Sequence, residues 1–176
     1  KINSFMLIVF IYVGLVYPIV GSWQWGSGFL YSLGFYDFAG STLVHSVGGW
    51  GALIIIYILG ARKGKFDNNG NAVAIPGSNI PLSAAGVLIL WLGWFGFNGG
   101  SVLSADPANT SLVLVTTCLA AAAGGIGAAF FSNLLYKNLD ITMFMNGVLG
   151  GLVGITAGAD QMGPTEAIII GAIGGM

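Results

Sequence analysis

Charged side chains are scarce in this chain of 176 residues. Lys and Arg number 5 and Asp and Glu 6, so charged residues make up 6% of the sequence, whereas soluble domains carry about a quarter. So few charges cannot cover a surface exposed to water, and 56% of the residues are hydrophobic. The composition therefore indicates a protein whose solvent is a lipid bilayer. The net charge of -1 also excludes the basic surface typical of nucleic-acid-binding proteins.

Residue types that support catalysis or disulfide formation are also lacking. Cys118 is the single cysteine and His45 the single histidine, which leaves no intrachain disulfide and no histidine pair for a metal. We find no phosphate-binding loop, no nucleophile beside a base and no signal-peptide pattern. The glycine run at 124–127 lies in an apolar segment with no preceding strand. We therefore expect neither an enzyme nor a cofactor site.

Glycine, by contrast, is abundant, with 30 residues. In membranes, glycine lets helix backbones approach closely, and small residues four apart mark helix contacts. Such spacing occurs within 147–151 and again in the series Gly150, Gly154 and Gly158. These faces predict tight helix packing rather than a binding site.

Long apolar segments dominate the chain. A membrane-spanning helix needs about 20 mostly apolar residues. Segments that meet this requirement, or nearly so, are 5–21, 38–60, 79–103, 109–136 and 142–158, and a sixth begins near Pro164. The sequence therefore predicts an all-α fold, a polytopic transmembrane helix bundle, with one membrane domain over residues 1–176.

The few basic residues fall on one side of this predicted bundle. If the helices alternate in direction, Lys1 and the loops 60–78 and 136–140 share a side and hold every Lys and Arg. The loops on the other side hold Asp106, Asp160 and Glu166 and no basic residue. By the positive-inside rule, the loops 60–78 and 136–140 are cytoplasmic.

His45 stands inside the second apolar segment, in the run from Asp37 to His45 that reads Asp-Phe-Ala-Gly-Ser-Thr-Leu-Val-His. An ionisable residue within a membrane segment is costly and is by default a candidate functional residue. A neutral imidazole offers one donor and one acceptor to a small polar solute without charging a pore. The alternative is a histidine whose hydrogen bonds are satisfied by a neighbouring helix.

Asp37 and Trp25, which precede His45 in the chain, each have two interpretations. Asp37 lies eight residues earlier, on a similar helix face and at the predicted helix start; it either caps free N–H groups or attracts a cation to the outer mouth. Trp25 lies in the predicted outer loop, where its ring either binds a small cation or belongs to the interfacial aromatic belt. Trp23, at similar depth, has no further argument for a role.

Phe97 and Ser101 end the third segment on the predicted outer side. They are four residues apart and therefore share a helix face. The pair offers a ring that blocks water and a hydroxyl that accepts a hydrogen bond from a cation. Ordinary helix packing explains Phe97 equally well.

Taken together, these features resemble the ammonium transporter (Amt/Mep/Rh) family, and within it the Amt branch. The resemblance rests on the Asp37–His45 run, on Gly-Trp-Phe-Gly-Phe-Asn-Gly-Gly-Ser at 93–101, on the spacing from Trp25 to Asp37, and on Gly-Leu-Val-Gly-Ile-Thr-Ala-Gly at 151–158. It covers essentially the whole chain. Gly99 departs from the Ala or Pro usual in the family, and we expect little effect because glycine is small.

The resemblance implies an incomplete portion of an eleven-helix fold, from about the fourth to the ninth helix, in a cell-membrane protein that forms homotrimers within membrane lipid. It implies that Trp25 and Ser101 bind ammonium, that Phe97 is one ring of a gate, and that His45 is the first of two pore histidines. Asp37 matches a mainly structural acidic residue near the outer mouth. A cytoplasmic PII-type regulator is a further expected partner.

The function implied is ammonium or ammonia transport across the membrane. Ammonium is bound at the outer aromatic site and deprotonated, and ammonia passes through an apolar, histidine-lined pore. Two alternatives stay open at this point. One is an ammonium sensor module of a membrane signalling protein, and the other is a pore for another small neutral molecule.

Overall fold

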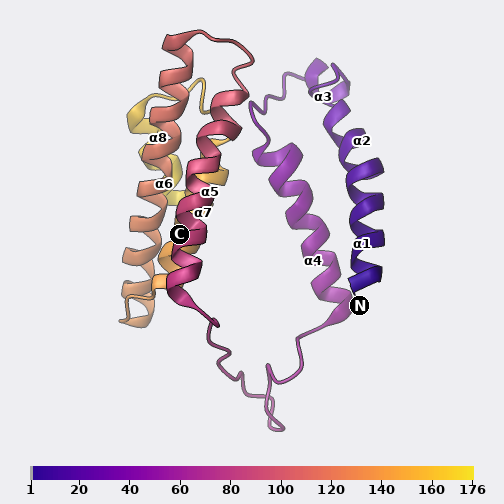
Figure 1. Ribbon diagram of the computed structural model, residues 1–176, viewed down its shortest axis with the longest axis vertical. Helices are drawn as coiled ribbons and strands as arrows, with labels where there is room; N and C mark the ends of the chain where they lie inside the picture. The colour runs from indigo at the N-terminus through magenta and orange to yellow at the C-terminus, as the bar shows by residue number, and fades with distance from the viewer. Residues whose placement is uncertain (1) are drawn as a thin grey trace.

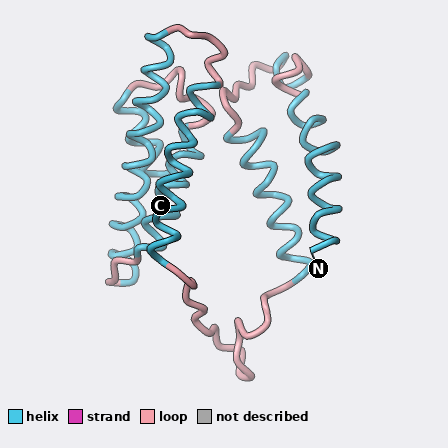
Figure 2. Tube along the Cα trace, in the orientation of Figure 1, coloured by secondary structure: helices cyan, strands magenta, loops and turns pink. Residues whose placement is uncertain are grey.

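The computed structural model describes residues 2–176 and is built of helices and connecting loops (Figure 1, Figure 2). Four helices in the described part of the chain are long and apolar enough to cross a membrane, namely Ile2–Ser22, Ser41–Leu59, Ile80–Gly100 and Pro107–Tyr136. Two shorter apolar helices, Ile141–Ile155 and Pro164–Gly175, complete the set. The predicted polytopic helical fold is therefore confirmed. Lys1, which we assigned to the basic side, lies outside the described residues.

The first two long helices form a pair, and each contains a π-helical turn. The first runs through α1 (Ile2–Ile11), η1 (Tyr12–Val16) and α2 (Tyr17–Ser22). The second begins with η2 (Ser41–Ser46) and continues as α4 (Val47–Leu59). The Tyr12 hydroxyl donates to the Val47 carbonyl oxygen at 2.5 Å, so a hydrogen bond joins the two helices next to both π-helical turns. Such turns are frequent at functional sites.

The remaining helices are α5 (Ile80–Gly100), α6 (Pro107–Tyr136), α7 (Ile141–Ile155) and α8 (Pro164–Gly175), and a short α3 (Phe29–Ser32) lies in the loop before η2. Side chains cap three of their N-termini. Asn79, Asp106 and Asp140 each accept a hydrogen bond from a backbone N–H two or three residues later. Such caps satisfy donors that a helix start leaves free.

Glycines bring α6, α7 and α8 into backbone contact. A Cβ on Gly124 would overlap the Gly147 carbonyl oxygen, and a Cβ on Gly151 would overlap that of Ala120. On α8, Gly175 lies as closely against the Gly124 carbonyl. The packing predicted for 147–151 is therefore confirmed, and Gly124 of the glycine run takes part in it.

The packing predicted for the series Gly150, Gly154 and Gly158 is only partly confirmed. Gly150 packs against the backbone of Gly174, but a Cβ on Gly154 would meet Ile170 at an ordinary 3.5 Å. Gly158 lies beyond the end of α7 at Ile155. The helix ends three residues earlier than the sequence predicts because the backbone turns at 156–162.

The helix ends alternate as the basic residues predict. Figure 1 shows the 60–79 and 137–140 loops at one end of the molecule, where α1 also begins, and the 23–40, 101–106 and 156–163 loops at the other. The sequence predicts that the second helix begins at residue 38, but it begins at Ser41. Gly40 causes this shift, because its φ of 114° places it in the left-handed region.

Candidate functional site

The Asp37 carboxylate organises the start of the second helix. It is 1% exposed, and it accepts backbone N–H groups from Gly40 and Ser41 at one oxygen and from Thr42 and Leu43 at the other, at 2.8 to 3.0 Å. Four donors around one carboxylate satisfy the N–H groups that a helix start leaves free. Since Asp37 precedes the helix, our argument that it shares a helix face with His45 is wrong.

The loop that follows Asp37 lies on the C-terminal end of α7. Phe38 N–H donates to the Ala157 carbonyl at 2.9 Å and Ala39 N–H to the Thr156 carbonyl at 3.0 Å. The Ser41 hydroxyl donates to the Val153 carbonyl. The last carbonyls of a helix have no partner within it, so the 38–41 segment supplies donors to α7 from a distant part of the sequence.

Trp25 is fixed against the same loop. Its indole N–H donates to the Asp37 carbonyl oxygen at 2.8 Å. A Cβ on Gly40 would lie 3.2 Å from the edge of the Trp25 ring, so glycine at this position leaves room for the indole. The side chain stays 42% exposed, which leaves ring surface for a ligand. Trp23 packs instead against Phe29, with ring centroids 5.4 Å apart.

His45 lies in η2 and stacks on the indole of Trp94 from α5. Their ring centroids are 5.1 Å apart and their planes differ by 16°. Phe97 lies at 5.7 Å from the His45 ring and at 5.6 Å from the Trp94 ring, tilted against both. His45 Nε2 is buried and has no hydrogen-bond partner among the residues described. The three rings form one aromatic cluster, and the imidazole in it keeps one nitrogen without a hydrogen-bond partner.

Phe97 and Ser101 share a face of α5, as their spacing predicts. The Ser101 hydroxyl donates to the Phe97 carbonyl oxygen at 2.8 Å. Its proton is therefore committed, and its lone pairs remain to accept from a donor. Phe97 is 38% exposed. The residues thus form two groups, Trp25 with Asp37 and Phe97 with His45, and no hydrogen bond joins Trp25 to Ser101 within residues 2–176.

Sequence reasoning missed Trp94 of this cluster and Thr156, which binds it. Trp94 lies three residues before Phe97 and so on the same face of α5, a spacing that could have indicated it. Thr156 accepts the Trp94 indole N–H at 2.9 Å. Nothing in the sequence indicates this bond, because the two residues are 62 positions apart.

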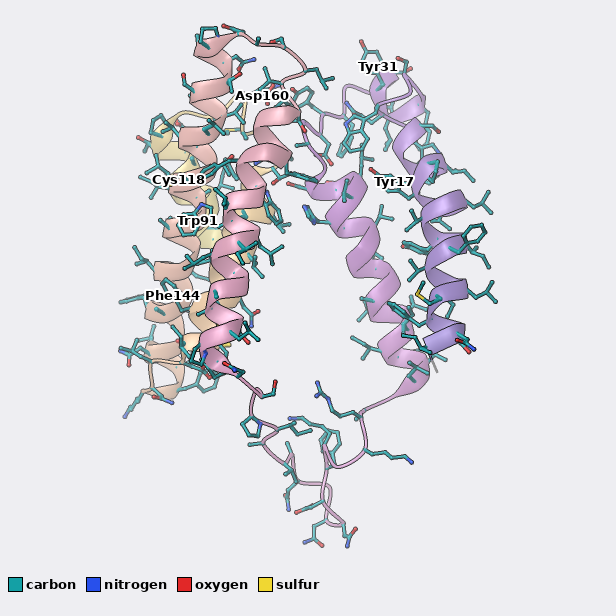
Figure 3. All side chains as sticks on the ribbon, in the orientation of Figure 1. Tyr17, Tyr31, Trp91, Cys118, Phe144 and Asp160 are labelled. Atoms are coloured by element: carbon teal, nitrogen blue, oxygen red, sulfur yellow. The ribbon has the colours of Figure 1, made fainter. Side chains whose placement is uncertain are left out.

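A tyrosine and an aspartate join two loops at the same end of the molecule. The Tyr36 hydroxyl donates to an Asp160 carboxylate oxygen, and Figure 3 shows Asp160 at the end where Tyr31 of α3 lies. Burial, the hydrogen bond and the negative charge of Asp160 raise the pKa of Tyr36 to about 12. The contact ties the loop that carries Trp25 and Asp37 to the loop after α7.

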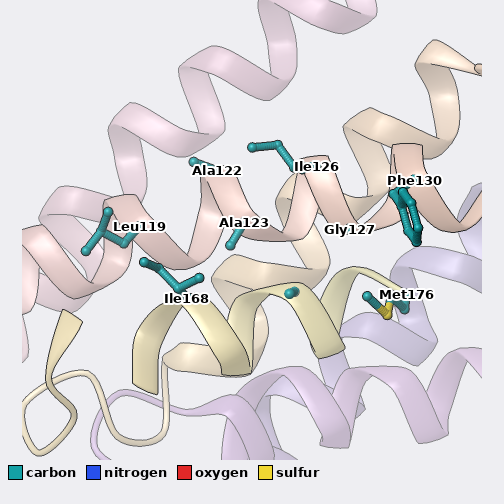
Figure 4. Close-up of a pocket in the computed structure, with 9 residues that line it drawn as sticks. Leu119, Ala122, Ala123, Ile126, Gly127, Phe130, Ile168 and Met176 are labelled. Atoms are coloured by element: carbon teal, nitrogen blue, oxygen red, sulfur yellow. The ribbon is translucent and has the colours of Figure 1, made fainter. Parts of the chain in front are cut away.

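Two grooves lie away from the aromatic cluster. One of about 480 Å³ runs between α6 and α8 and is lined by apolar side chains such as Leu119, Phe130 and Ile168 (Figure 4). Another of about 510 Å³ lies between α1 and α4. Neither includes a residue of the aromatic cluster. Apolar lining of this kind suits lipid or another helix rather than a polar solute.

Comparison with known proteins gives one consistent answer. The profile described as Ammonium Transporter Family matches residues 1–176. The chain is 47% identical to the putative ammonium transporter sll1017 of Synechocystis over 99% of its own length and 40% of that protein. It is 41% identical to the ammonium transporter Amt2 of Archaeoglobus fulgidus, with the same shares of each chain covered.

Solved structures agree with this result. A structure titled Sensor Amt Protein has a TM-score of 0.89 and 41% identity over 93% of this chain and 42% of its own. Candida albicans Mep2 has a TM-score of 0.89 and 30% identity over 99% of this chain and 38% of its own. The chain thus spans about two fifths of the length of the relatives it matches.

Proposed function

Since the chain belongs to the ammonium transporter family, we propose that the multi-pass membrane protein containing it carries ammonium or ammonia across its membrane. The observation that carries the proposal is the buried, unpartnered Nε2 of His45 beside the Trp94 and Phe97 rings. A free imidazole nitrogen in an aromatic, apolar setting offers a hydrogen bond to a small polar solute. A histidine satisfied by a neighbouring helix would instead have a partner at that atom.

The outer loop and the end of α5 supply the recruiting site. The exposed face of Trp25 attracts a small cation through its ring quadrupole, and the Ser101 lone pairs accept from an ammonium N–H. Both side chains are held by hydrogen bonds to backbone carbonyls, so little ordering is required when the cation binds. Asp37 has an indirect role. Its carboxylate caps the start of the second helix, and its own backbone carbonyl accepts the Trp25 indole N–H.

Passage past Phe97 requires loss of the charge. An ion within the hydrocarbon costs at least about 3 kcal/mol, whereas ammonia is neutral. Ammonium therefore leaves its proton near Phe97, which acts as one ring of a gate, and ammonia continues past His45. By analogy with the family, the proton follows a relay that uses His45 and a second histidine.

The cellular setting follows from the same proposal. The protein lies in the cell membrane, surrounded by lipid, with the basic 60–78 and 136–140 loops in the cytoplasm. Family membership favours a homotrimer with one pore in each subunit. A PII-type protein would act as a regulator from the cytoplasmic side, where these loops are exposed.

The test is ammonium-dependent growth and ammonium-induced current of cells that express the full-length protein, unchanged or with His45→Ala. We expect transport by the unchanged protein and its loss in the variant at equal membrane abundance. Trp25→Ala tests the recruiting site in the same assay, and Trp23→Ala is its matched control, because Trp23 has neither the Asp37 bond nor the Gly40 contact of Trp25. Undiminished transport by His45→Ala would contradict the role of His45, and no transport by the unchanged protein would contradict the function.

An ammonium sensor is the second candidate, because the structure titled Sensor Amt Protein is 41% identical to this chain. In that case the Trp25 and Ser101 site would matter more than flux. A kinase or cyclase domain in the full-length protein, together with signalling that persists when flux is blocked by His45→Ala, would favour the sensor.

A further inference from the structure

Thr156, at the C-terminal end of α7, joins three segments of the molecule. It is 0% exposed. Its hydroxyl oxygen accepts the Trp94 indole N–H at 2.9 Å, and its hydroxyl proton goes to the Leu152 carbonyl at 2.6 Å. Its own carbonyl accepts the Ala39 N–H at 3.0 Å. One residue thus contacts α5, α7 and the loop before η2.

The hydroxyl of Thr156 has a fixed direction. A hydroxyl has one proton and two lone pairs, and the proton is committed to Leu152 within the helix. A lone pair is therefore always presented to Trp94. Because a buried N–H without an acceptor costs about 1–3 kcal/mol, any rotation of the indole that breaks this bond is opposed.

The same indole carries the imidazole of His45 on its face. The two planes differ by 16°, so the orientation of the His45 ring follows that of Trp94. Thr156 also holds the loop before the His45 helix, because its carbonyl accepts the Ala39 N–H. The Asp37 carboxylate of that loop in turn caps the start of the helix. Contacts of Thr156 therefore help to fix the positions of both Trp94 and the helix that carries His45.

We propose that Thr156 is a positioning residue that sets the plane of Trp94 and, through it, the plane in which His45 presents Nε2 to the passing solute. Thr156 acts through Trp94, and no hydrogen bond joins it to His45 among the described residues. The consequence for flux rests on the function proposed above. The geometric part, that Thr156 orients Trp94, stands independently of it.

The experiment compares Thr156→Val, Thr156→Ser and Trp94→Phe in the full-length protein. Valine keeps the shape and removes both side-chain hydrogen bonds. Only the bond to Trp94 orients the indole, so we expect the maximal transport rate per molecule to fall about tenfold, the effect of losing that one hydrogen bond. The half-saturating ammonium concentration should change little, because Trp25 and Ser101 are untouched. Serine restores the hydroxyl and should restore most of the rate.

Thr116→Val is the matched control. Thr116 is equally buried, and its hydroxyl donates to the Ala159 carbonyl at 2.8 Å, three residues beyond Thr156. It lies on α6 and contacts neither Trp94 nor His45 through that bond. A merely structural role for Thr156 predicts the same losses in Thr116→Val and Thr156→Val, whereas the positioning role predicts a loss of rate only in Thr156→Val.

A spectroscopic measurement separates this inference from the transport function. Ultraviolet resonance Raman spectra report the hydrogen bond of an indole N–H, and the difference between the unchanged protein and Trp94→Phe isolates Trp94. We expect the Trp94 marker to shift to its unbonded value in Thr156→Val and to stay in Thr156→Ser. An unshifted marker in Thr156→Val overturns the inference even if the protein transports, and a shifted marker supports it even if the protein does not.

Discussion

The α6–α7–α8 bundle and the N-terminal helix pair are both apolar, but they are held together by different means. In the most hydrophobic part of α6, 56% of the residues are buried, against 6% in each helix of the N-terminal pair. In the bundle, glycines place backbone against backbone. The N-terminal pair instead leaves large apolar side chains exposed in this chain, and its polar contacts include the Tyr12–Val47 bond between the helices and the Asp37 cap at the start of the second helix.

The comparison teaches how a bilayer changes the rules of packing. Burying apolar side chains against each other gains little when lipid is equally apolar, so close backbone contact and hydrogen bonds decide which helices associate. The aromatic cluster lies between the two regions. His45 comes from the polar-linked pair, whereas Trp94 and Thr156 come from the other side. Site geometry therefore depends on contacts between the two regions, namely the stack of His45 on Trp94 and the hydrogen bond from Trp94 to Thr156.

The largest effect is expected where the bundle backbones meet. Gly151→Ala adds a Cβ that overlaps the Ala120 carbonyl, and such overpacking should destabilise the protein by about 3 kcal/mol. Gly49→Ala in α4 is the control, because nothing lies within 4 Å of its added Cβ. Thermal unfolding of the full-length protein in detergent measures both. Equal melting temperatures for the two variants would contradict the distinction between the regions.

The second effect concerns the polar links of the N-terminal pair. Asp37→Asn leaves one acceptor oxygen for four N–H groups, so we expect a loss of about 2 kcal/mol, near the upper end for a helix cap. Faster amide exchange in residues 40–43 would accompany it. Asp106→Asn on α6 is matched in charge, but Asp106 caps through one bond to Ala108 at 3.2 Å. Its loss should be smaller, and a larger loss there would reverse the comparison.

The smallest effect lies at the contact between the regions, the Tyr36–Asp160 bond. Burial and Asp160 raise the pKa of Tyr36 to about 12 from an ordinary 10. Because the folded-state value is the higher one, the stability contributed by this hydroxyl is fully present below about pH 10 and is lost as the pH rises through about 12. Subtracting the ultraviolet titration of Tyr36→Phe from that of the unchanged protein isolates the midpoint.

A control for the tyrosine titration comes from the other partner. Asp160→Asn removes the negative charge that opposes the phenolate, so the midpoint should fall towards 10 while the part due to burial remains. A Tyr36 midpoint near 10 in the unchanged protein would show that the two loops are not held together in solution.

Much of this architecture could be read from the residues. Long apolar runs and the one-sided distribution of Lys and Arg predict the helices and their alternation, because a bilayer demands both. The errors fall where polar contacts override the apolar pattern. The second helix begins late because Asp37 and Gly40 form a loop, and α7 ends early because its last carbonyls meet that loop.

The candidate site likewise has residues that the sequence indicates and contacts that only the structure shows. Residue type points to His45, since an ionisable side chain is unusual in a membrane segment, whereas the roles of Trp25, Phe97 and Ser101 follow from the resemblance to the family. The sequence by itself therefore determined the membrane setting and the helices, and it indicated these side chains as candidates. Only the tertiary structure decided that Trp94 stacks on His45 and that Thr156 holds Trp94. Those contacts join residues far apart in the chain, and no local pattern specifies which distant partner completes a hydrogen bond.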